Sequence, residues 1–364
     1  MIGMGLGGRI VKTDFSFRSN QIRGLLVVGA AIVSSSAFAG WTAYDVNPTA
    51  APPFVQSGIW GLTDSWFVGF HSNLSGSEEL GIQWYGFGAG QYNTLSMAGT
   101  GGTFGEATCT DGFQIGGGVW DVSGNVMATL WYGGYSNPVL LHPATASSSY
   151  IRAVYSSRQV GFAVIGGNRH AAYWEYPGGV FRDLHQNRNR FRISNANTIF
   201  GDVIGGYIGQ STSSRYAAIW AGARRRLSTV HPNGYAYSEI KGLYADAYVG
   251  LANSAGNDHA YIWSPLGGGY DIHQPSWVSS FATGIDEDKV SVTADYNAWI
   301  FDRYNSFTPW ENLDAILDAQ FPGEYIGSYA ACIWRDASSN VTLVGGWGLL
   351  PSGLGKAIVW KYVP

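Results

Sequence analysis

A short motif recurs seven times along this 364-residue chain, and it constrains the fold more than any other feature. In each copy a small residue, Ala or Gly, precedes an aromatic residue by three positions, and successive aromatics lie 38–59 residues apart. Repeats of this length are typical of four short strands joined by turns, which is the unit of a propeller blade. The seven copies are Gly81–Trp84, Ala128–Trp131, Ala171–Trp174, Ala217–Trp220, Ala260–Trp263, Ala298–Phe301 and Ala357–Trp360.

Three further strand-like segments accompany each copy. A segment such as Ile204-Gly205-Gly206 precedes the aromatic in six units, and we expect its glycine where two backbones crowd together. Val290-Ser291-Val292 is the degenerate member of this set. Another strand follows the aromatic and ends in an apolar–polar pair such as Leu184-His185 or Leu313-Asp314, and a fourth strand opens the next unit. With 51 glycines and only 13% charged residues, the composition also favours an all-β class.

The two ends of the repeat array complement one another. The last unit ends at Pro364 without the strand that should follow its aromatic, whereas Tyr44-Asp45-Val46-Asn47 is such a strand without a unit. We therefore predict that the N-terminal strand completes the C-terminal blade, which removes the two open sheet edges of a circular array. The sequence predicts one domain, residues 40–364, folded as an all-β, seven-bladed β-propeller.

Residues 1–39 have the pattern of a signal peptide. Arg18 and Arg23 precede the apolar run 24–33, and Ala37-Phe38-Ala39 matches an A-x-A cleavage site. The apolar run is too short to span a bilayer, and no later segment reaches 18 uncharged apolar residues. We expect cleavage near Ala39, no transmembrane segment, and a secreted, extracellular or periplasmic location.

The longest spacing, between the last two aromatics, leaves room for a helix. Thr308-Pro309-Trp310-Glu311 has the pattern of a capping box with proline at the first helical position. Trp310, Leu313 and Leu317 then fall on one face of a short helix that ends near Gln320. We expect this helix to lie across one end of the barrel.

The two cysteines, Cys109 and Cys332, fall in the same strand of units two and seven, with unit one between them. Packed sheets lie about 10 Å apart, so two such steps exceed the Cα separation of about 7 Å that a disulfide allows. The sequence predicts two buried free thiols.

Four histidines end equivalent strands in four consecutive units. If these strands are the outermost ones, neighbouring histidines lie more than about 10 Å apart, too far to share one zinc ion. Two interpretations stay open: strand-end residues that cap a turn, or a row of ligand-contacting or pH-responsive groups on one face. The acidic run Asp286-Glu287-Asp288 is either a solvated loop or a cation ligand, and we predict no metal site. The four histidines are His142, His185, His231 and His273.

Charge is distributed unevenly along the chain. Residues 151–226 hold 11 arginines and 3 acidic residues, whereas residues 227–364 hold 6 basic and 14 acidic residues. Units three and four therefore form a positive sector on an otherwise acidic disc. The run Arg224-Arg225-Arg226 could contact anionic polysaccharide, the cell envelope or an acidic protein surface, or simply cover outer-strand surface. Nucleic acid is not an expected partner of an exported protein.

The segments "NRHAAYW…FRDLH", "DVIGGYIGQ", "NDHAYIW" and "NLDAIL…VTLVGGWGLLPSGLGKAIVW" resemble the HAF repeats of bacterial extracellular proteins, and the similarity covers most of the mature chain. His170-Ala171 and His259-Ala260 keep the His-Ala pair of that family. Tyr216, Asn297 and Lys356 replace the histidine elsewhere, which argues against an essential ligand role for it. The resemblance implies an exported propeller with no assigned catalytic residues.

A convergent catalytic set is not visible in the sequence. No G-x-S-x-G motif occurs, and Asp45, Asp183 and Asp271 recur only as strand-end residues of separate units, so no facing carboxylate pair is indicated. We predict an exported, non-enzymatic binding or structural module without a cofactor, which contacts a protein or the cell envelope. The alternatives are a carbohydrate-binding lectin and, third, a polysaccharide hydrolase or lyase. The sugar-binding candidates are Trp41, Trp66, Trp120, Trp277, Trp310 and Trp347.

Overall fold

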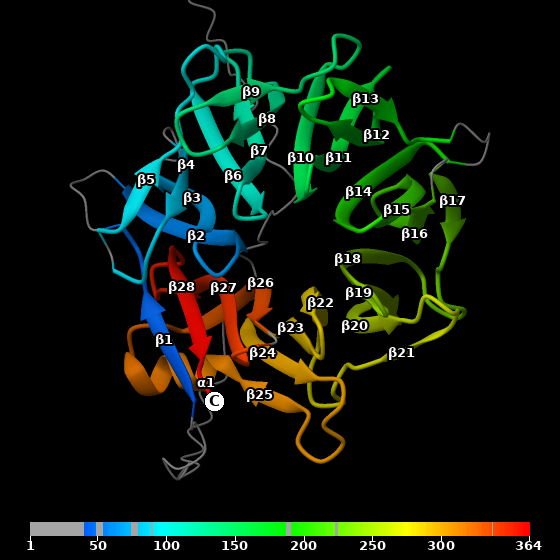
Figure 1. Cartoon of the computed structure of the whole chain (residues 1–364). Coiled ribbons are helices and arrows are strands. Elements are labelled where there is room, and N and C mark those ends of the chain that lie inside the picture. Colours follow the sequence, from blue (N-terminus) through cyan, green and yellow to red (C-terminus); the bar gives the residue numbers. More distant parts are fainter. Residues whose placement is uncertain are drawn as a thin grey trace, which may run out of the picture.

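Seven four-stranded antiparallel sheets surround a common axis, which confirms the seven-bladed β-propeller (Figure 1). The computed structural model describes residues 40–48, 54–73, 79–88, 90–186, 191–222, 225–336 and 338–364, so the predicted leader lies outside the described residues. Within those ranges no helix has the length and apolar character needed to cross a membrane.

The inner half of each blade is a pair of long strands. The innermost strands of blades 1 to 7 are β2 (Phe54–Leu62), β6 (Phe104–Thr110), β10 (Ser148–Tyr155), β14 (Ile193–Phe200), β18 (Ser238–Tyr244), β22 (Ser280–Asp286) and β26 (Gly327–Asp336). The second strands are β3 (Phe67–Asn73), β7 (Gln114–Trp120), β11 (Arg158–Ile165), β15 (Val203–Ser211), β19 (Ala247–Ser254), β23 (Lys289–Ala294) and β27 (Val341–Leu349).

The outer half pairs the strand that carries the repeated aromatic with a short edge strand. The third strands are β4 (Glu79–Trp84), β8 (Val126–Tyr132), β12 (Asn168–Glu175), β16 (Ser214–Ala221), β20 (Asn257–Trp263), β24 (Asn297–Asp302) and β28 (Gly355–Tyr362). The outer strands are β5 (Tyr92–Thr94), β9 (Pro138–Leu140), β13 (Val180–Asp183), β17 (Arg226–Thr229), β21 (Gly269–Asp271), β25 (Trp310–Asn312) and, in blade 7, β1 (Trp41–Asp45).

The N-terminal strand closes the ring as predicted. β1 pairs antiparallel with β28, with Ala43 opposite Trp360 and Asp45 opposite Ile358. One residue further, the Val46 N–H donates to the Ala357 carbonyl at 3.0 Å. Blade 7 therefore takes three strands from the C-terminal end of the chain and its outer strand from the N-terminal end (Figure 1).

The glycines of the second strands lie where two backbones meet. In blade 4 the innermost strand bulges between Ala196 and Thr198, and a Cβ on Gly206 would lie 1.9 Å from the Asn195 carbonyl oxygen. With the backbone of blade 4 as it is, any side chain there would displace the inner strand, so this blade needs glycine. Blade 6 has Val292 in the matching register, in agreement with its degenerate sequence. The same approach, at 1.8–2.0 Å, occurs at Gly69, Gly117, Gly161, Gly250 and Gly346.

The small residue of the repeated motif is part of a clamp between neighbouring blades. In blade 3 the Ala171 N–H donates to Ser194 Oγ of blade 4 at 2.8 Å, and the Ala171 carbonyl accepts from the Leu184 N–H at 2.8 Å. Trp220 of blade 4 then donates from Nε1 to the Leu184 carbonyl at 3.0 Å. The motif therefore fastens consecutive blades together, with its aromatic in the core. The clamp serines are Ser57, Ser149, Ser194, Ser238, Ser280 and Ser328.

The predicted helix starts later than its capping-box sequence indicates. Helix α1 (Leu313–Gln320) has Asn312 as its N-cap, whose side chain accepts from the Ala315 N–H at 3.0 Å. The expectation for Thr308 was wrong because Trp310–Asn312 form β25, in which Trp310 pairs with Phe301 of β24. Ladder hydrogen bonds in blade 6 outweigh local capping, and Leu313-Asp314 open the helix instead of ending the strand.

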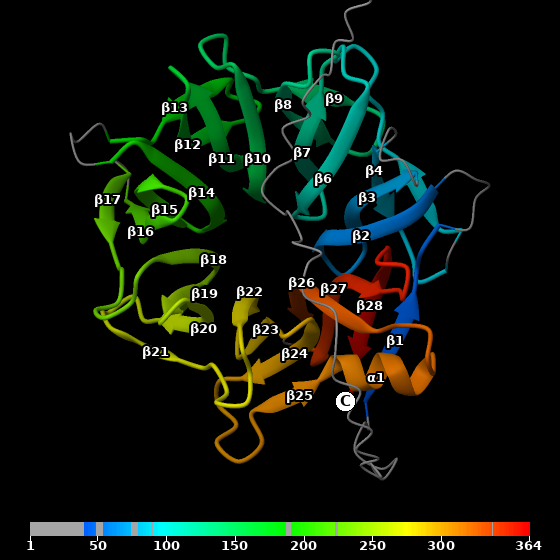
Figure 2. The ribbon, with the colours of Figure 1, turned by 180° about the vertical axis from the view of Figure 1, so that it is seen from behind.

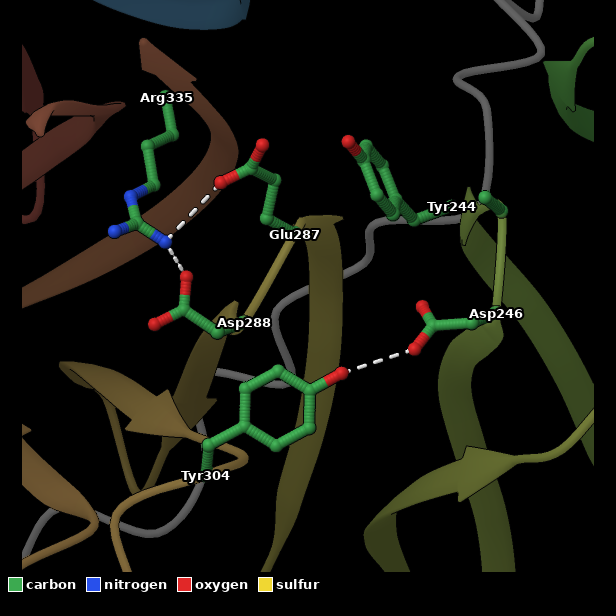
Figure 3. A pocket seen from close by; sticks show the side chains of 7 residues that line it. Tyr244, Asp246, Glu287, Asp288, Tyr304 and Arg335 are labelled. Atoms are coloured by element: carbon green, nitrogen blue, oxygen red, sulfur yellow. Dashed lines mark hydrogen bonds and ion pairs between the residues drawn. The ribbon is translucent and has the colours of Figure 1, made fainter. Parts of the chain in front are cut away.

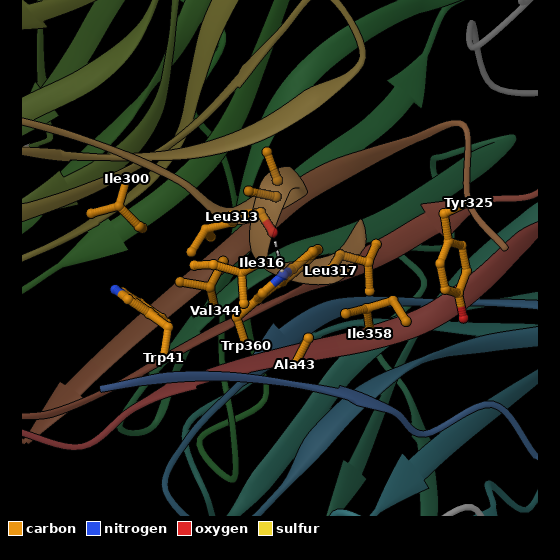
Figure 4. Close-up of a cluster of buried hydrophobic side chains, with 12 residues drawn as sticks. Trp41, Ala43, Ile300, Leu313, Ile316, Leu317, Tyr325, Val344, Ile358 and Trp360 are labelled. Carbon is orange, nitrogen blue, oxygen red and sulfur yellow. Dashed lines mark hydrogen bonds between the residues drawn. The ribbon is translucent and has the colours of Figure 1, made fainter. Parts of the chain in front are cut away.

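Helix α1 does not lie across an end of the barrel. Its buried residues Leu313, Ile316 and Leu317 pack between blades 6 and 7, against Trp41 of β1 and Trp360 of β28 (Figure 4). Trp360 Nε1 donates to the Leu313 carbonyl at 2.9 Å. Figures 1 and 2 show α1 at the rim of the disc. The expected position was wrong because the apolar face of α1 packs into the core between blades 6 and 7, where β1 closes the ring.

Both cysteines are free, as predicted. Cys109 is buried, and burial raises the pKa of its thiol to about 12. Cys332 is only half-buried as a residue, which corrects part of the expectation.

Candidate functional site

The four predicted histidines lie in the clamps between blades. Each Nδ1 is 2.7–2.9 Å from the clamp serine Oγ of the next blade, as in His185 with Ser194. His231 and His273 also contact the Tyr235 and Trp277 carbonyls through Nε2, each at 3.0 Å. Because a carbonyl only accepts, these Nε2 atoms carry the hydrogen and the neutral Nδ1 accepts from serine.

Blades 3 and 5 add a second imidazole to this arrangement. The ring of His170 stacks on His185 at 4.3 Å between centroids, and that of His259 stacks on His273 at 3.9 Å. His170 also contacts Asp183 at 2.8 Å. Burial and the neighbouring imidazole lower the pKa of His185 and of His273. The described residues contain no cluster of His, Cys, Asp or Glu arranged to hold a metal ion.

The predicted arginine run is only partly described. Arg224 lies outside the described residues. Arg225 donates to the Asp202 carbonyl at 2.8 Å, and its guanidinium lies 4.8 Å from the Tyr173 ring centroid. Arg226 opens β17 and is exposed. Arg225 is therefore held against blades 3 and 4, whereas Arg226 faces solvent. A ligand-binding role for the run stays a prediction.

The tryptophans suggested for sugar binding are buried or half-buried. Trp347 stacks on Tyr329 at 4.1 Å between ring centroids, and Trp277 makes an edge contact with Trp310 at 4.8 Å. Trp41 is 8% exposed and donates from Nε1 to Glu311. None of the six is exposed, so no specific observation favours a lectin.

A cavity of about 400 Å³ opens between blades 5, 6 and 7 on the face that carries the turns between first and second strands (Figure 3). Residues of the β18–β19 turn, the β22–β23 turn, the loop after β24 and the end of β26 surround it. The lining residues are Tyr244, Ala245, Asp246, Glu287, Asp288, Tyr304 and Arg335.

Three carboxylates and one guanidinium line this first cavity. Arg335 Nη1 is 3.3 Å from Glu287 and also contacts Asp288. On the opposite wall, Asp246 accepts from the Tyr304 hydroxyl at 3.0 Å (Figure 3). Arg303, whose side chain is only 6% exposed, donates to Asp246 at 2.6 Å. The lining itself keeps an excess of negative charge.

Hydrogen bonds and burial set the charge state of the first cavity. The Arg303 hydrogen bonds lower the pKa of Asp246, so that carboxylate is ionised at neutral pH. Burial, together with nearby Glu287, raises the pKa of Tyr244, which keeps its hydroxyl proton. Burial also raises the pKa of Asp286 to about 6, and Asp286 accepts from the Arg335 N–H at 2.7 Å.

The backbone at Glu287 is strained. Its φ of +51° lies in the left-handed region, which costs a residue with a Cβ about 1–2 kcal/mol. The matching turns of blades 3 and 4 have Ser156 and Gly201 at φ 55° and 56°. A long charged side chain at such a position is unusual, and strained residues concentrate at functional sites.

An exposed aromatic residue, Tyr304, lines the first cavity, and two more are exposed in blades 5 and 6. Tyr304 is 71% exposed and Phe307, three residues later in the same loop, is 94% exposed. Tyr270 is 49% exposed, and burial, with smaller contributions from Tyr304 and Asp246, raises its pKa. Aromatic residues are enriched in protein–protein contacts, and Tyr and Trp are frequent among the few residues that carry most of the binding energy.

A second cavity of about 280 Å³ adjoins the first, since Asp288 and Arg335 line both. We call the two cavities together the acidic cleft. The second is lined by Trp41, Asp288, Lys289, Asp302, Glu311, Arg335, Asn340, Thr342, Tyr362 and Pro364.

Sequence reasoning found only part of the acidic cleft. It singled out the run 286–288 as a solvated loop or a cation ligand, but missed Asp246, Tyr304 and Arg335. The available signal was the repeat itself. Asp246, Asp288 and Arg335 lie 42 and 47 residues apart, about one blade each. Asp246 and Asp288 occupy matching turns of blades 5 and 6, and Arg335 lies near the end of the corresponding first strand of blade 7.

No protein-family model matches this sequence, and no curated protein matches it. One similar solved structure is the propeller domain of the Trilobed protease from Pyrococcus furiosus, which has an open velcro topology. It aligns at 11% identity with a TM-score of 0.56, and the alignment covers 86% of this chain and 96% of that one. An oligogalacturonate lyase from Vibrio parahaemolyticus aligns at 9% identity with a TM-score of 0.53, over 88% and 93%.

TolB from Acinetobacter baumannii aligns at 12% identity with a TM-score of 0.42, over 62% of this chain, and the chain spans 61% of that TolB. At such low identities the comparisons show a propeller fold, and no argument about function rests on them. Unlike the open topology of the Trilobed protease domain, this ring is closed by β1.

Proposed function

We propose that the chain is an exported, non-enzymatic propeller of the HAF-repeat kind, which binds a protein partner by taking a cationic side chain into the first cavity of the acidic cleft. The observation that carries the proposal is that cavity of about 400 Å³, lined by three carboxylates, two tyrosines and a single arginine. The signal-peptide pattern and the repeat resemblance support export.

Charge and shape both favour a basic side chain. Arg335 already bridges Glu287 and Asp288, which shows how these carboxylates hold a guanidinium. Asp246 and Glu287 keep 55% and 31% of their side chains exposed, so an incoming cation can reach them. Tyr304 offers an aromatic face to the stem and head group of an arginine or lysine. A charge-assisted hydrogen bond is roughly twice as strong as a neutral one.

A binding titration tests the proposal. The probe is a fluorescein-labelled nonapeptide of serine and glycine with one central arginine, titrated with residues 40–364 at low salt. We expect saturable binding that weakens as salt rises, because exposed charges are screened beyond about 10 Å at 0.1 M. Glu287→Gln should weaken binding about tenfold, since it removes one carboxylate but keeps the side-chain shape.

Asp64→Asn is the matched control. Asp64 is exposed in the turn between β2 and β3 of blade 1, so the same change of charge occurs on the same face but away from the cleft. Its affinity should equal that of the wild type. No saturable binding at low salt, or equal losses in both variants, would refute the proposed function.

A further inference from the structure

We propose that the acidic cleft recognises two basic side chains of one extended segment, spaced as Arg-x-Arg, with the second seated in the second cavity. This inference rests on the proposed function, because it assigns the remainder of the same cleft. It identifies the partner by its chemistry: an extended protein segment with alternate basic residues.

The second cavity has its own negative groups. Glu311 keeps 37% of its side chain exposed, accepts from Trp41 Nε1 and lies 3.9 Å from Lys289 Nζ. Lys289 forms its shorter ion pair with Asp302, whose Oδ2 lies 2.8 Å from Lys289 Nζ. Burial alone would raise the pKa of Asp302, but the hydrogen bond from Lys289 lowers it. The three carboxylates of this cavity outnumber its two basic side chains.

The two cavities form one continuous site because the Asp288–Arg335 ion pair is their common wall. In an extended segment, side chains i and i+2 lie on the same side, about 7 Å apart. Because the two cavities share one wall, they can accept two such neighbouring side chains. A helical segment would place its same-face residues three or four positions apart instead.

Aromatic surfaces accompany both cavities. Tyr304 lines the first, and the half-buried Tyr362, whose ring centroid is 5.4 Å from that of the buried Trp41, lines the second. Long arginine and lysine stems gain from apolar contact while their charged heads reach carboxylates. The cleft therefore suits two long cationic side chains better than a small inorganic cation, and no metal-holding cluster exists among the described residues.

The test compares three nonapeptides of serine and glycine: one with a single central arginine, one with Arg-x-Arg, and one with Arg-x-x-x-Arg. We expect Arg-x-Arg to bind at least tenfold more tightly than the single-arginine peptide, and Arg-x-x-x-Arg to gain less. Glu311→Gln keeps an oxygen that can accept from Trp41, so the fold should persist; melting temperatures of all variants check this.

Glu311→Gln should abolish the gain from the second arginine and leave the affinity for the single-arginine peptide within twofold. Glu287→Gln should weaken both peptides, and Asp64→Asn neither. If Arg-x-Arg binds no more tightly than one arginine, or Glu311→Gln leaves the gain intact, the two-subsite inference is wrong while the proposed function stands. If the single-arginine peptide does not bind to the wild type, both fail.

Discussion

At the residue scale, the least replaceable positions are glycines where two backbones approach. Gly206 and its five equivalents face an inner-strand carbonyl at a distance that a Cβ cannot occupy. The sequence already placed glycine at crowded strands, but the distance of closest approach depends on the bulge in the neighbouring strand. Asn197 forms that bulge in blade 4.

Gly206→Ala should destabilise the protein by about 3 kcal/mol or more, because overpacking usually costs 1–3 kcal/mol and here the obstacle is rigid backbone. Gly90→Ala is the matched control, since nothing lies within 4 Å of its added Cβ. Urea denaturation of both variants measures the difference. Equal stabilities would mean that the inner strand moves without cost.

At the element scale, the histidine clamps make the contacts between blades sensitive to pH. His185 of blade 3 accepts from Ser194 of blade 4 only while its Nδ1 is unprotonated. Burial lowers its pKa in the folded state, and the stacked His170 adds to this effect, while Asp183 acts in the opposite direction. The unfolded chain therefore binds protons more readily, and the free energy of unfolding should fall as pH drops below about 6.5.

The chain itself supplies a non-titrating replacement. Between blades 7 and 1 the same clamp uses Asn47, which accepts from Ser57 Oγ at 2.6 Å. The double variant His185→Asn with His273→Asn should keep the hydrogen bonds and lose less stability between pH 7 and pH 5 than the wild type. Thermal melts at each pH measure this slope. An unchanged slope would show that other groups, such as His71, whose pKa burial lowers to about 4, dominate it.

Element boundaries show where sequence reasoning stops. The strand order and the closing strand could be predicted from the repeat. The last unit lacks one strand and the N-terminus has one strand without a unit, so pairing the two ends completes the seventh blade. The start of α1 could not be predicted in this way. The local sequence of Trp310–Asn312 is compatible with both a helix N-terminus and a strand, and only pairing with β24 decides between them. Tertiary hydrogen bonds that are distant in sequence set that boundary.

At the scale of the whole molecule, ring closure determines stability. Deleting residues 40–48 removes β1 and exposes the edge of β28, and it also removes Trp41 from the core of blades 6 and 7. We expect the melting temperature to fall by roughly 10 °C or more relative to residues 40–364. An unchanged melting temperature would contradict the closure by β1.

The candidate site was less predictable than the fold. The histidines and arginines could be predicted as candidates because they recur or cluster in the sequence. The acidic cleft is instead lined by single residues from three blades, which form no sequence motif. Asp246, Asp288 and Arg335 converge because the first strands of neighbouring blades end, and the turns that follow them lie, on one face of the ring. The period predicts that proximity, but the volume between the side chains depends on packing that no local pattern shows.

Hydrogen–deuterium exchange of residues 40–364, with and without the Arg-x-Arg peptide, tests the central claim most directly, because it locates the bound segment. We predict slower exchange at the β18–β19 turn, the β22–β23 turn and the loop after β24, with no change in blades 3 and 4. Protection confined to the positive sector around Arg226, or protection nowhere, would contradict a binding site in the acidic cleft.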